Sequence, residues 1–227
     1  MHQSRYILAL AVGCCIAATI CSCTNDAYDT GDGDYSYLRA DFGEVATGAD
    51  TCCIVGAETD EGETLSFNQP YRCRWAAVAD TTYRALIYYN KVNDDVEPVS
   101  IVAVSVLHAM PLADGYAMHD DPVMFESAWM SPNGKYLNMG IALKSGKADA
   151  VDARHVIGLV PHSSADNADG THTVAVQLYH NRNSVPEYYT VRTYLSFPLA
   201  DYPDADTLKV LLNTYDGMVE KKVKLGK

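Results

Sequence analysis

The stretch Leu137-Asn-Met-Gly-Ile-Ala-Leu143 decides the fold, because its large apolar residues recur at every second position. Leu137, Met139, Ile141 and Leu143 therefore share one face of a strand, since successive side chains of a strand point to opposite sides. A register shift of one residue would turn this whole apolar row to water. The stretch predicts a β-strand with one face buried in a core.

The same alternation recurs through the C-terminal half, where turn residues such as Asp, Asn and Gly separate the rows. The rows expected to face the core are Val174, Val176 and Leu178; Tyr189, Val191, Leu195 and Phe197; Leu208, Val210 and Leu212; and Val219, Val223 and Leu225. Arg192 and Ser196 are expected to point outward. Strands at this spacing predict an antiparallel β-sandwich over residues 119–227.

The N-terminal half contains a second set of strand candidates. They are Tyr35–Thr47, Cys52–Ala57, Glu63–Phe67, Thr82–Val92 and Pro98–Leu107. The last of these is a nearly continuous apolar run, which we expect to be buried on both faces. Short strands at this density predict a five-stranded barrel of the oligonucleotide/oligosaccharide-binding (OB) type over residues 35–112. The predicted fold class is all-β, with an OB-like barrel followed by a sandwich.

The first residues have the pattern of a targeting segment. Arg5 precedes an uncharged apolar run, Tyr6–Ile20, which is shorter than the roughly 20 residues that a membrane-spanning helix needs. Residues 1–22 are predicted to be a signal peptide. The run ends in Ile20-Cys-Ser-Cys23, which resembles the lipobox of bacterial lipoproteins, so Cys23 is expected to receive lipid. Ordinary secretion without lipid is the alternative.

This N-terminal targeting segment predicts an outer-membrane lipoprotein of the bacterial cell envelope, on the periplasmic face or at the cell surface, held to the membrane by its lipid. Residues 23–34 contain several Asp and no basic residue, which predicts a flexible tether. The whole chain has 17 basic and 29 acidic residues and a net charge of −12. That balance argues against a nucleic-acid partner, because phosphate binding depends on clustered Lys and Arg.

A series of short motifs runs along the chain. They are Tyr35-Ser-Tyr37, Asp41-Phe-Gly-Glu-Val45, Asp121-Pro-Val123, Gly134-Lys-Tyr-Leu-Asn-Met139, Val176-Gln-Leu-Tyr-His-Asn181, Tyr194-Leu-Ser-Phe-Pro-Leu199 and Asn213-Thr-Tyr-Asp-Gly217. Together they resemble the NigD-like lipoproteins of gut and oral Bacteroidetes. The resemblance implies an N-terminal OB-type barrel and a C-terminal sandwich, and it supplies no catalytic residue. The family is named after a bacteriocin gene cluster, which implies a bacteriocin-associated or immunity-type protein as one hypothesis.

Three cysteines follow the expected anchor: Cys52, Cys53 and Cys73. In an oxidising envelope, Cys73 could form a disulfide with Cys52 or with Cys53. Only one of the two could do so, because adjacent strand residues point to opposite faces. The alternative is three buried thiols that act as small apolar side chains. Closely spaced Cys or His pairs of the kind that bind zinc are absent from the sequence, so no metal and no cofactor is expected.

No catalytic motif is visible, since the sequence lacks H-E-x-x-H, G-x-S-x-G and phosphate-binding glycine patterns. The chain contains 16 Tyr, and some of them could face a ligand, because exposed aromatic rings stack on sugars or anchor protein interfaces. The candidates are Tyr83, Tyr88, Tyr89, Tyr188 and Tyr194. The alternative is that these rings fill cross-strand pairs.

These observations predict a non-enzymatic, envelope-anchored binding protein whose partner is an unidentified protein or glycan. A second hypothesis is an enzyme or accessory protein that processes surface glycans, and only the scattered carboxylates and tyrosines favour it. A third is a structural spacer between the membrane and another component.

Overall fold

The computed structural model describes residues 37–147 and 153–226. The predicted signal peptide, the lipidation residue Cys23 and the acidic tether lie outside the described residues. The chain divides into Met1–Tyr37 and a second unit, Leu38–Lys227, which contains every described strand.

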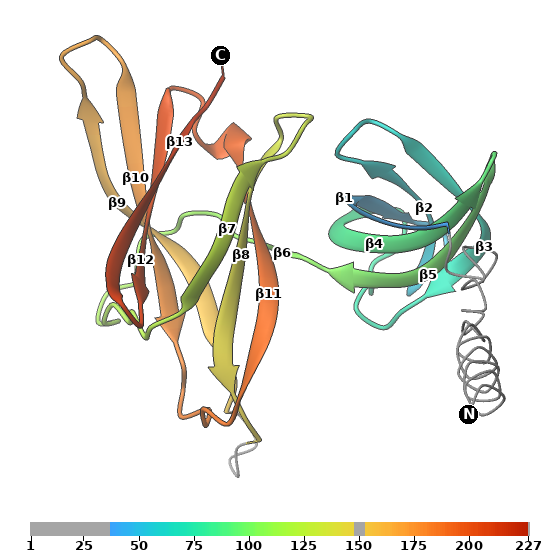
Figure 1. Ribbon diagram of the computed structural model, residues 1–227, viewed down its shortest axis with the longest axis horizontal. Helices are drawn as coiled ribbons and strands as arrows, with labels where there is room; N and C mark the ends of the chain where they lie inside the picture. Colours follow the sequence, from blue (N-terminus) through green and yellow to red (C-terminus); the bar gives the residue numbers. More distant parts are fainter. Residues whose placement is uncertain (1–36, 148–152, 227) are drawn as a thin grey trace, which may run out of the picture. The chain divides into compact units, whose positions relative to one another are not determined.

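The first five strands form a closed barrel in the order β1-β2-β3-β5-β4 (Figure 1). Their bounds are β1 Leu38–Thr47, β2 Cys53–Thr59, β3 Thr64–Arg72, β4 Thr82–Val92 and β5 Asp95–Ala103. Neighbouring strands are antiparallel, except that β3 and β5 close the barrel through a parallel pairing of Phe67 with Val96. Val45, Ile54 and Ile87 are among the fully buried residues that fill it. The predicted five-stranded barrel is confirmed.

The apolar run Pro98–Leu107 was expected to be one strand buried on both faces, and this is wrong. In the structure β5 ends at Ala103, and the short strand β6, Ser105–Val106, pairs in parallel with β11 of the sandwich. Val99 and Val102 of β5 are 36% and 50% exposed. The physical reason is that a strand of a small barrel has only one face towards the core, so its alternate residues face solvent.

The C-terminal strands form two four-stranded sheets, ordered β13-β12-β10-β9 and β6-β11-β8-β7, which lie face to face in Figure 1. Their bounds are β7 Met124–Met130, β8 Tyr136–Ser145, β9 Val156–Asp166, β10 His172–Asn181, β11 Tyr189–Pro198, β12 Thr207–Thr214 and β13 Gly217–Lys224. The single-turn helix η1, Leu199–Asp201, follows β11. The predicted sandwich is confirmed, and its pairings are antiparallel apart from β10 with β12 and β6 with β11.

Most predicted core rows are buried as expected, including all four apolar residues of the stretch 137–143. The row on β11 is only half right, because Leu195 and Phe197 are buried while Tyr189 and Val191 are 56% and 43% exposed. The neighbouring strand β6 pairs only with Leu195 and Ser196. Among the described residues, no strand pairs with the outer edge of β11 before Leu195, and this first half of the strand, the free edge of β11, lies outside the packed core.

The outer face of the sheet that contains β8 and β11 is covered by the barrel, which the alternation pattern did not reveal. Ser196 was expected to face solvent, but Ser196 and its cross-strand neighbour Asn138 are both 0% exposed. The guanidinium of Arg84 on β4 reaches both of them. Its Nε donates to Ser196 Oγ at 3.2 Å and its Nη2 donates to Asn138 Oδ1 at 3.1 Å.

Arg84 also forms a buried ion pair with Asp60, which follows β2. The two guanidinium nitrogens donate to the two carboxylate oxygens at 2.5 and 2.7 Å, and the residues are 4% and 6% exposed. The Tyr136 ring lies 4.3 Å from the guanidinium carbon. One arginine thus connects the barrel with two strands of the sandwich.

Two further sets of contacts complete this interface. Glu44 of the barrel accepts hydrogen bonds from Lys135 and from the Tyr136 hydroxyl, both at 2.8 Å. Burial raises the pKa of the Glu44 carboxyl, but these two hydrogen bonds outweigh it and the net pKa is lowered. Phe42 packs edge to face on Trp129 and Tyr194, with ring centroids 5.4 and 5.1 Å apart. Charge pairs and aromatic rings together hold the two modules to each other.

Any side chain in place of Gly43 on β1 is predicted to lower the stability of the protein. A Cβ at this position would lie 2.5 Å from the carbonyl oxygen of Glu58, which is backbone and cannot swing aside. Gly43→Ala should therefore lower the free energy of unfolding by about 1–3 kcal/mol, as overpacking does. Gly158→Ala on β9 is the matched control, because its Cβ would meet Tyr179 at an ordinary 3.7 Å. Urea denaturation of both variants tests this, and equal midpoints would contradict it.

Candidate functional site

A groove follows the linker that joins β6 to β7. The linker is attached to both sheets, since Leu107 N donates to Ser196 O of β11 and Met110 N donates to Leu159 O of β9, each at 2.9 Å. The linker thus crosses from the sheet that contains β11 to the sheet that contains β9. Two hollows lie along it, each with a volume of about 580 Å³, and both include His108 in their walls.

The first of these, the acidic hollow, lies between the linker, β10 and the segment after η1. Its walls are His108, Ala109, Pro161, His172, Val174, Val176, Asp201, Tyr202, Pro203, Asp204 and Ala205. The floor is apolar because Val174 and Val176 occupy alternate positions on the inner face of β10. The carboxylates of Asp201 and Asp204 lie at its exposed rim.

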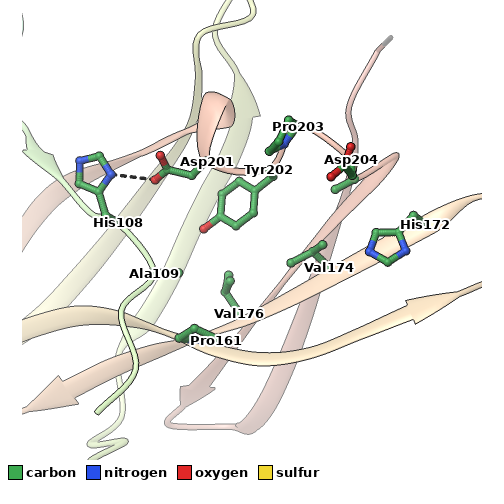
Figure 2. A pocket seen from close by; sticks show the side chains of 11 residues that line it. His108, Ala109, Pro161, His172, Val174, Val176, Asp201, Tyr202, Pro203 and Asp204 are labelled. Atoms are coloured by element: carbon green, nitrogen blue, oxygen red, sulfur yellow. Dashed lines mark hydrogen bonds and ion pairs between the residues drawn. The ribbon is translucent and has the colours of Figure 1, made fainter. Parts of the chain in front are cut away.

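The polar groups of the acidic hollow include one side chain without a partner. His108 Nδ1 lies 2.7 Å from Asp201 Oδ2, and the dashed line in Figure 2 marks this contact. Tyr202 is only 7% exposed, and its hydroxyl is buried without a hydrogen-bond partner. Figure 2 shows the hydroxyl end of this ring pointing into the hollow, towards the linker. Burial, and next to it Asp201, raises the pKa of Tyr202 to about 12, so the hydroxyl keeps its proton.

The second, the apolar hollow, continues the groove on the other side of His108. It is lined by Val106, Leu107, His108, Met110, Pro111, Leu112, Ala113, Tyr116, Val156, Ile157, Gly158, Leu159, Val160 and Tyr179. Met110 is 68% and Tyr116 is 72% exposed, and Val156 at the start of β9 is also exposed. Contiguous exposed apolar side chains of this kind mark interaction sites on soluble proteins.

The charge of the groove is one-sided. Its walls carry Asp201 and Asp204 but no Lys or Arg among the described residues. Lys209, Lys222 and Lys224 line a different hollow, together with residues such as Thr173 and Ala175 that alternate with Val174 and Val176 on β10. These lysines therefore lie on the opposite face of the same sheet and do not neutralise the groove.

A pair of stacked histidines lies beyond the apolar hollow. His155 Nδ1 is 2.9 Å from Nε2 of His180, whose own Nδ1 is 2.8 Å from the carbonyl oxygen of Asp121. His180 is 2% exposed, and its partners account for it as a structural residue. Nε2 of His155 is buried and has no hydrogen-bond partner. A proton added there would be buried without an acceptor, and burial, followed by the neighbouring His180, lowers the pKa of His155.

This pair should make the fold sensitive to acid. The folded-state pKa of His155 lies below its unfolded value of 6.5, so its stabilising effect is complete above pH 6.5 and is lost as the pH falls from 6.5 towards the folded-state pKa. We expect the free energy of unfolding to decrease between pH 7 and pH 5. His155→Phe keeps the stacking but cannot titrate, so its decrease should be smaller. Denaturation at both pH values measures this, and an identical decrease in the free energy of unfolding for the unmodified chain and for His155→Phe would contradict the prediction.

Ser164, His172 and Asp166 have the connectivity of a hydrolase triad on the β9–β10 hairpin. His172 Nε2 lies 2.9 Å from Ser164 Oγ, and its Nδ1 lies 2.6 Å from Asp166 Oδ1. The Asp166 side chain is, however, 91% exposed. A solvated carboxylate neither fixes an imidazole nor stabilises its charged form strongly, so cross-strand hydrogen bonding explains the cluster better than catalysis.

The five candidate tyrosines are not brought together. Tyr83 accepts a hydrogen bond from Val78 N at 2.9 Å and packs edge to face on Trp75. Tyr89 is 0% exposed and donates to Asp41 at 2.8 Å, and Tyr88 is half-buried on the same strand. 

The other two candidates lie on the C-terminal side of the chain. Tyr194 packs in the interface between barrel and sandwich, against Phe42. Tyr188, at the start of the free edge of β11, is the most exposed of the five, at 78%. Only Tyr188 therefore presents most of its ring to a partner.

All three described cysteines are free thiols in the structure. Cys53 is buried, whereas Cys52 and Cys73 are half-buried, and Cys73 N donates to Cys52 O at 3.0 Å. This hydrogen bond pairs the backbones of Cys52 and Cys73. The disulfide stays a prediction, which mass spectrometry of the oxidised protein can test.

Within residues 37–147 and 153–226, no group of three or more His, Cys, Asp or Glu is placed to hold a metal ion. No helix in the same ranges is both long enough and apolar enough to cross a membrane.

The comparisons with known proteins point to one family. Residues 110–225 match the family model of the NigD-like C-terminal beta sandwich domain. No curated protein sequence matches this chain. Among solved structures, a NigD-like immunity protein from Bacteroides caccae is similar, with 26% identity and a TM-score of 0.63 over 83% of this chain and 97% of that chain.

A protein of unknown function from Bacteroides vulgatus shares the fold at 18% identity, with a TM-score of 0.62 over 84% of this chain and 92% of that chain. At that identity the likeness concerns the fold alone.

Proposed function

Because this chain belongs to the NigD-like family, we propose that it is a non-enzymatic binding protein of the bacterial cell envelope, anchored by lipid on Cys23. The observation that carries the proposal is the groove along the linker, where exposed apolar residues adjoin two carboxylates and a buried, unpartnered hydroxyl. A rigid β scaffold that presents such a groove is suited to holding a partner.

The composition of the groove supports binding rather than catalysis. Its walls carry His108 beside Asp201, which could orient an imidazole base, but among the described residues they carry no Ser, Thr or Cys as a nucleophile. The anchor follows from the lipobox-like end of the apolar N-terminal run. Turnover of an envelope polymer by the purified protein would count against the non-enzymatic role.

A site-specific crosslink tests the use of the groove. A photoreactive amino acid at Met110, in the full chain in intact cells, should yield one discrete adduct. The same group at Met218 on β13 is the matched control, because this methionine is also exposed, at 53%, but does not line the groove. Cys23→Ser should release the chain from the membrane fraction. Equal adduct patterns from both positions would contradict the proposal.

An immunity-type role is the second candidate, and the similarity to the B. caccae immunity protein favours it. In this reading the partner in the groove is a toxin that acts at the envelope. Deletion of the gene should then increase the sensitivity of the cell to that toxin, and restoring the chain should reverse it. Unchanged sensitivity would remove this candidate but not the general binding role.

A further inference from the structure

We propose that the groove binds an extended cationic peptide segment, with a basic side chain against Asp201 and Asp204 and apolar side chains in the apolar hollow. The inference rests on the proposed function and adds the chemistry of the partner.

Charge is the first argument. The chain carries a net charge of −12, which attracts a positively charged partner over long range. At short range, Asp201 and Asp204 both line the acidic hollow, whereas Lys209, Lys222 and Lys224 line a hollow on the opposite face of this sheet. The His108 imidazole lies 2.7 Å from one carboxylate oxygen of Asp201, Oδ2. No described Lys or Arg lines the acidic hollow, so its walls present two carboxylates without an ammonium or guanidinium group of their own.

The Tyr202 hydroxyl is the second, independent argument. A buried hydroxyl without a hydrogen-bond partner costs free energy until a donor or acceptor reaches it. A hydroxyl oxygen can accept from an ammonium or guanidinium group, and this one points into the acidic hollow (Figure 2). One basic head could therefore engage the rim carboxylates and, with a small opening of the floor, this hydroxyl.

The apolar surface is the third argument, and it favours a peptide over a neutral glycan. The methylene stem of Lys or Arg can pack on Pro161, Val174 and Val176 while the charged head stays near the rim. Beyond His108, the walls are mainly Leu, Val, Ile, Met and Pro side chains. They offer little to the hydroxyls of a sugar but bury apolar peptide side chains well. The two hollows share His108, so an extended chain that passes this residue could occupy both.

Fluorescence anisotropy with the full chain in detergent and labelled synthetic peptides tests the proposal. The probe is a 12-residue peptide with lysines in one half and leucines in the other. The control peptide has glutamates in place of the lysines. We expect the lysine peptide to bind at least about tenfold more tightly than the glutamate peptide. Its affinity should fall as salt is raised, because rim charges are screened.

Variants of the acidic hollow localise the binding. Asp201→Asn with Asp204→Asn should weaken binding of the lysine peptide about tenfold. Asp94→Asn with Asp95→Asn is the matched control, because it removes the same charge from the β4–β5 turn of the barrel and should change little. Tyr202→Phe keeps the packed ring and removes only the hydroxyl, so we expect a fewfold loss of affinity in a folded protein.

The outcomes separate this inference from the proposed function. Equal binding of the two peptides, or an unaffected Asp201/Asp204 variant, overturns the cationic peptide. If the Met110 crosslink captures a partner whose attached segment is an uncharged peptide or a glycan, the groove binds a partner as proposed, but that partner is not a cationic peptide. A captured segment that carries Lys or Arg beside apolar residues supports the inference, and the absence of any adduct counts against the proposed function itself.

Discussion

Arg84→Ala is expected to destabilise the protein by about 3–5 kcal/mol, the typical result of breaking a buried ion pair from one side. The substitution leaves the Asp60 carboxylate buried without its bidentate partner. It also removes the donor to Asn138 and Ser196, both of which are inaccessible to solvent. Urea denaturation measures the loss, with the midpoint compared at constant slope.

The chain's two tryptophans can report where the loss occurs. Trp129 lies in the interface between barrel and sandwich, and Trp75 packs within the barrel. In Arg84→Ala, we expect the Trp129 signal to change at a lower urea concentration than the Trp75 signal, because the contact between the modules fails first. Trp75→Phe and Trp129→Phe variants isolate each signal.

Two controls separate buried charge from charge in general. Arg192→Ala breaks the ion pair with Glu126, where the Arg192 side chain is 77% exposed, and should cost no more than about 1 kcal/mol. Replacing Arg84 and Asp60 together by Met and Leu should cost much less than Arg84→Ala alone, because no unpaired charge stays buried. If Arg192→Ala and Arg84→Ala cost the same, the interface does not depend on this arginine.

Phe197→Ala should be comparably damaging, with a loss of about 3–5 kcal/mol. The side chain is 0% exposed and belongs to the sandwich core, where it packs with Leu137 and Leu208 among others. Its removal loses the transfer free energy of the ring and leaves a cavity that neighbouring strands cannot fully close. Thermal and urea denaturation both measure the loss.

Val191→Ala on the same strand is the matched control. Val191 has the same predicted facing as Phe197 but is 43% exposed. It should cost less than about 1 kcal/mol, since exposed substitutions usually change stability little. A large loss at Val191 would show that the free edge of β11 is packed in solution by something else.

Alternation carried most of the fold prediction because burial of one strand face imposes a period of two on any sequence. The stretch 137–143 and the row Leu208, Val210 and Leu212 are buried as expected. The same rule wrongly predicted that Ser196 faces solvent. Alternation shows which side chains point away from the sandwich core, but it does not show whether another part of the chain covers that outer face. The polar pair Asn138 and Ser196 faces the guanidinium of Arg84, which lies 54 and 112 positions away in sequence, at distances that only the folded chain defines.

The groove was missed for a related reason. Residues 110–121 break the strand pattern, and they lie where the predicted barrel, 35–112, gives way to the predicted sandwich, 119–227. The apolar residues Met110, Leu112 and Tyr116 in this segment were the available signal, because a true linker has little reason to carry them. Tyrosine abundance pointed elsewhere, since an aromatic ring serves equally well in a cross-strand pair, a module interface or a ligand site.

The sequence by itself determined that this protein is a barrel followed by a sandwich. A strand with one buried face needs apolar residues at alternate positions, and this pattern can be recognised in each strand without knowledge of the others. Only the tertiary structure decided that Arg84 joins the two modules, and that His108, Asp201 and Tyr202 meet along one groove. Those contacts join residues far apart in the chain, and their energies depend on burial and on distances that no local pattern records.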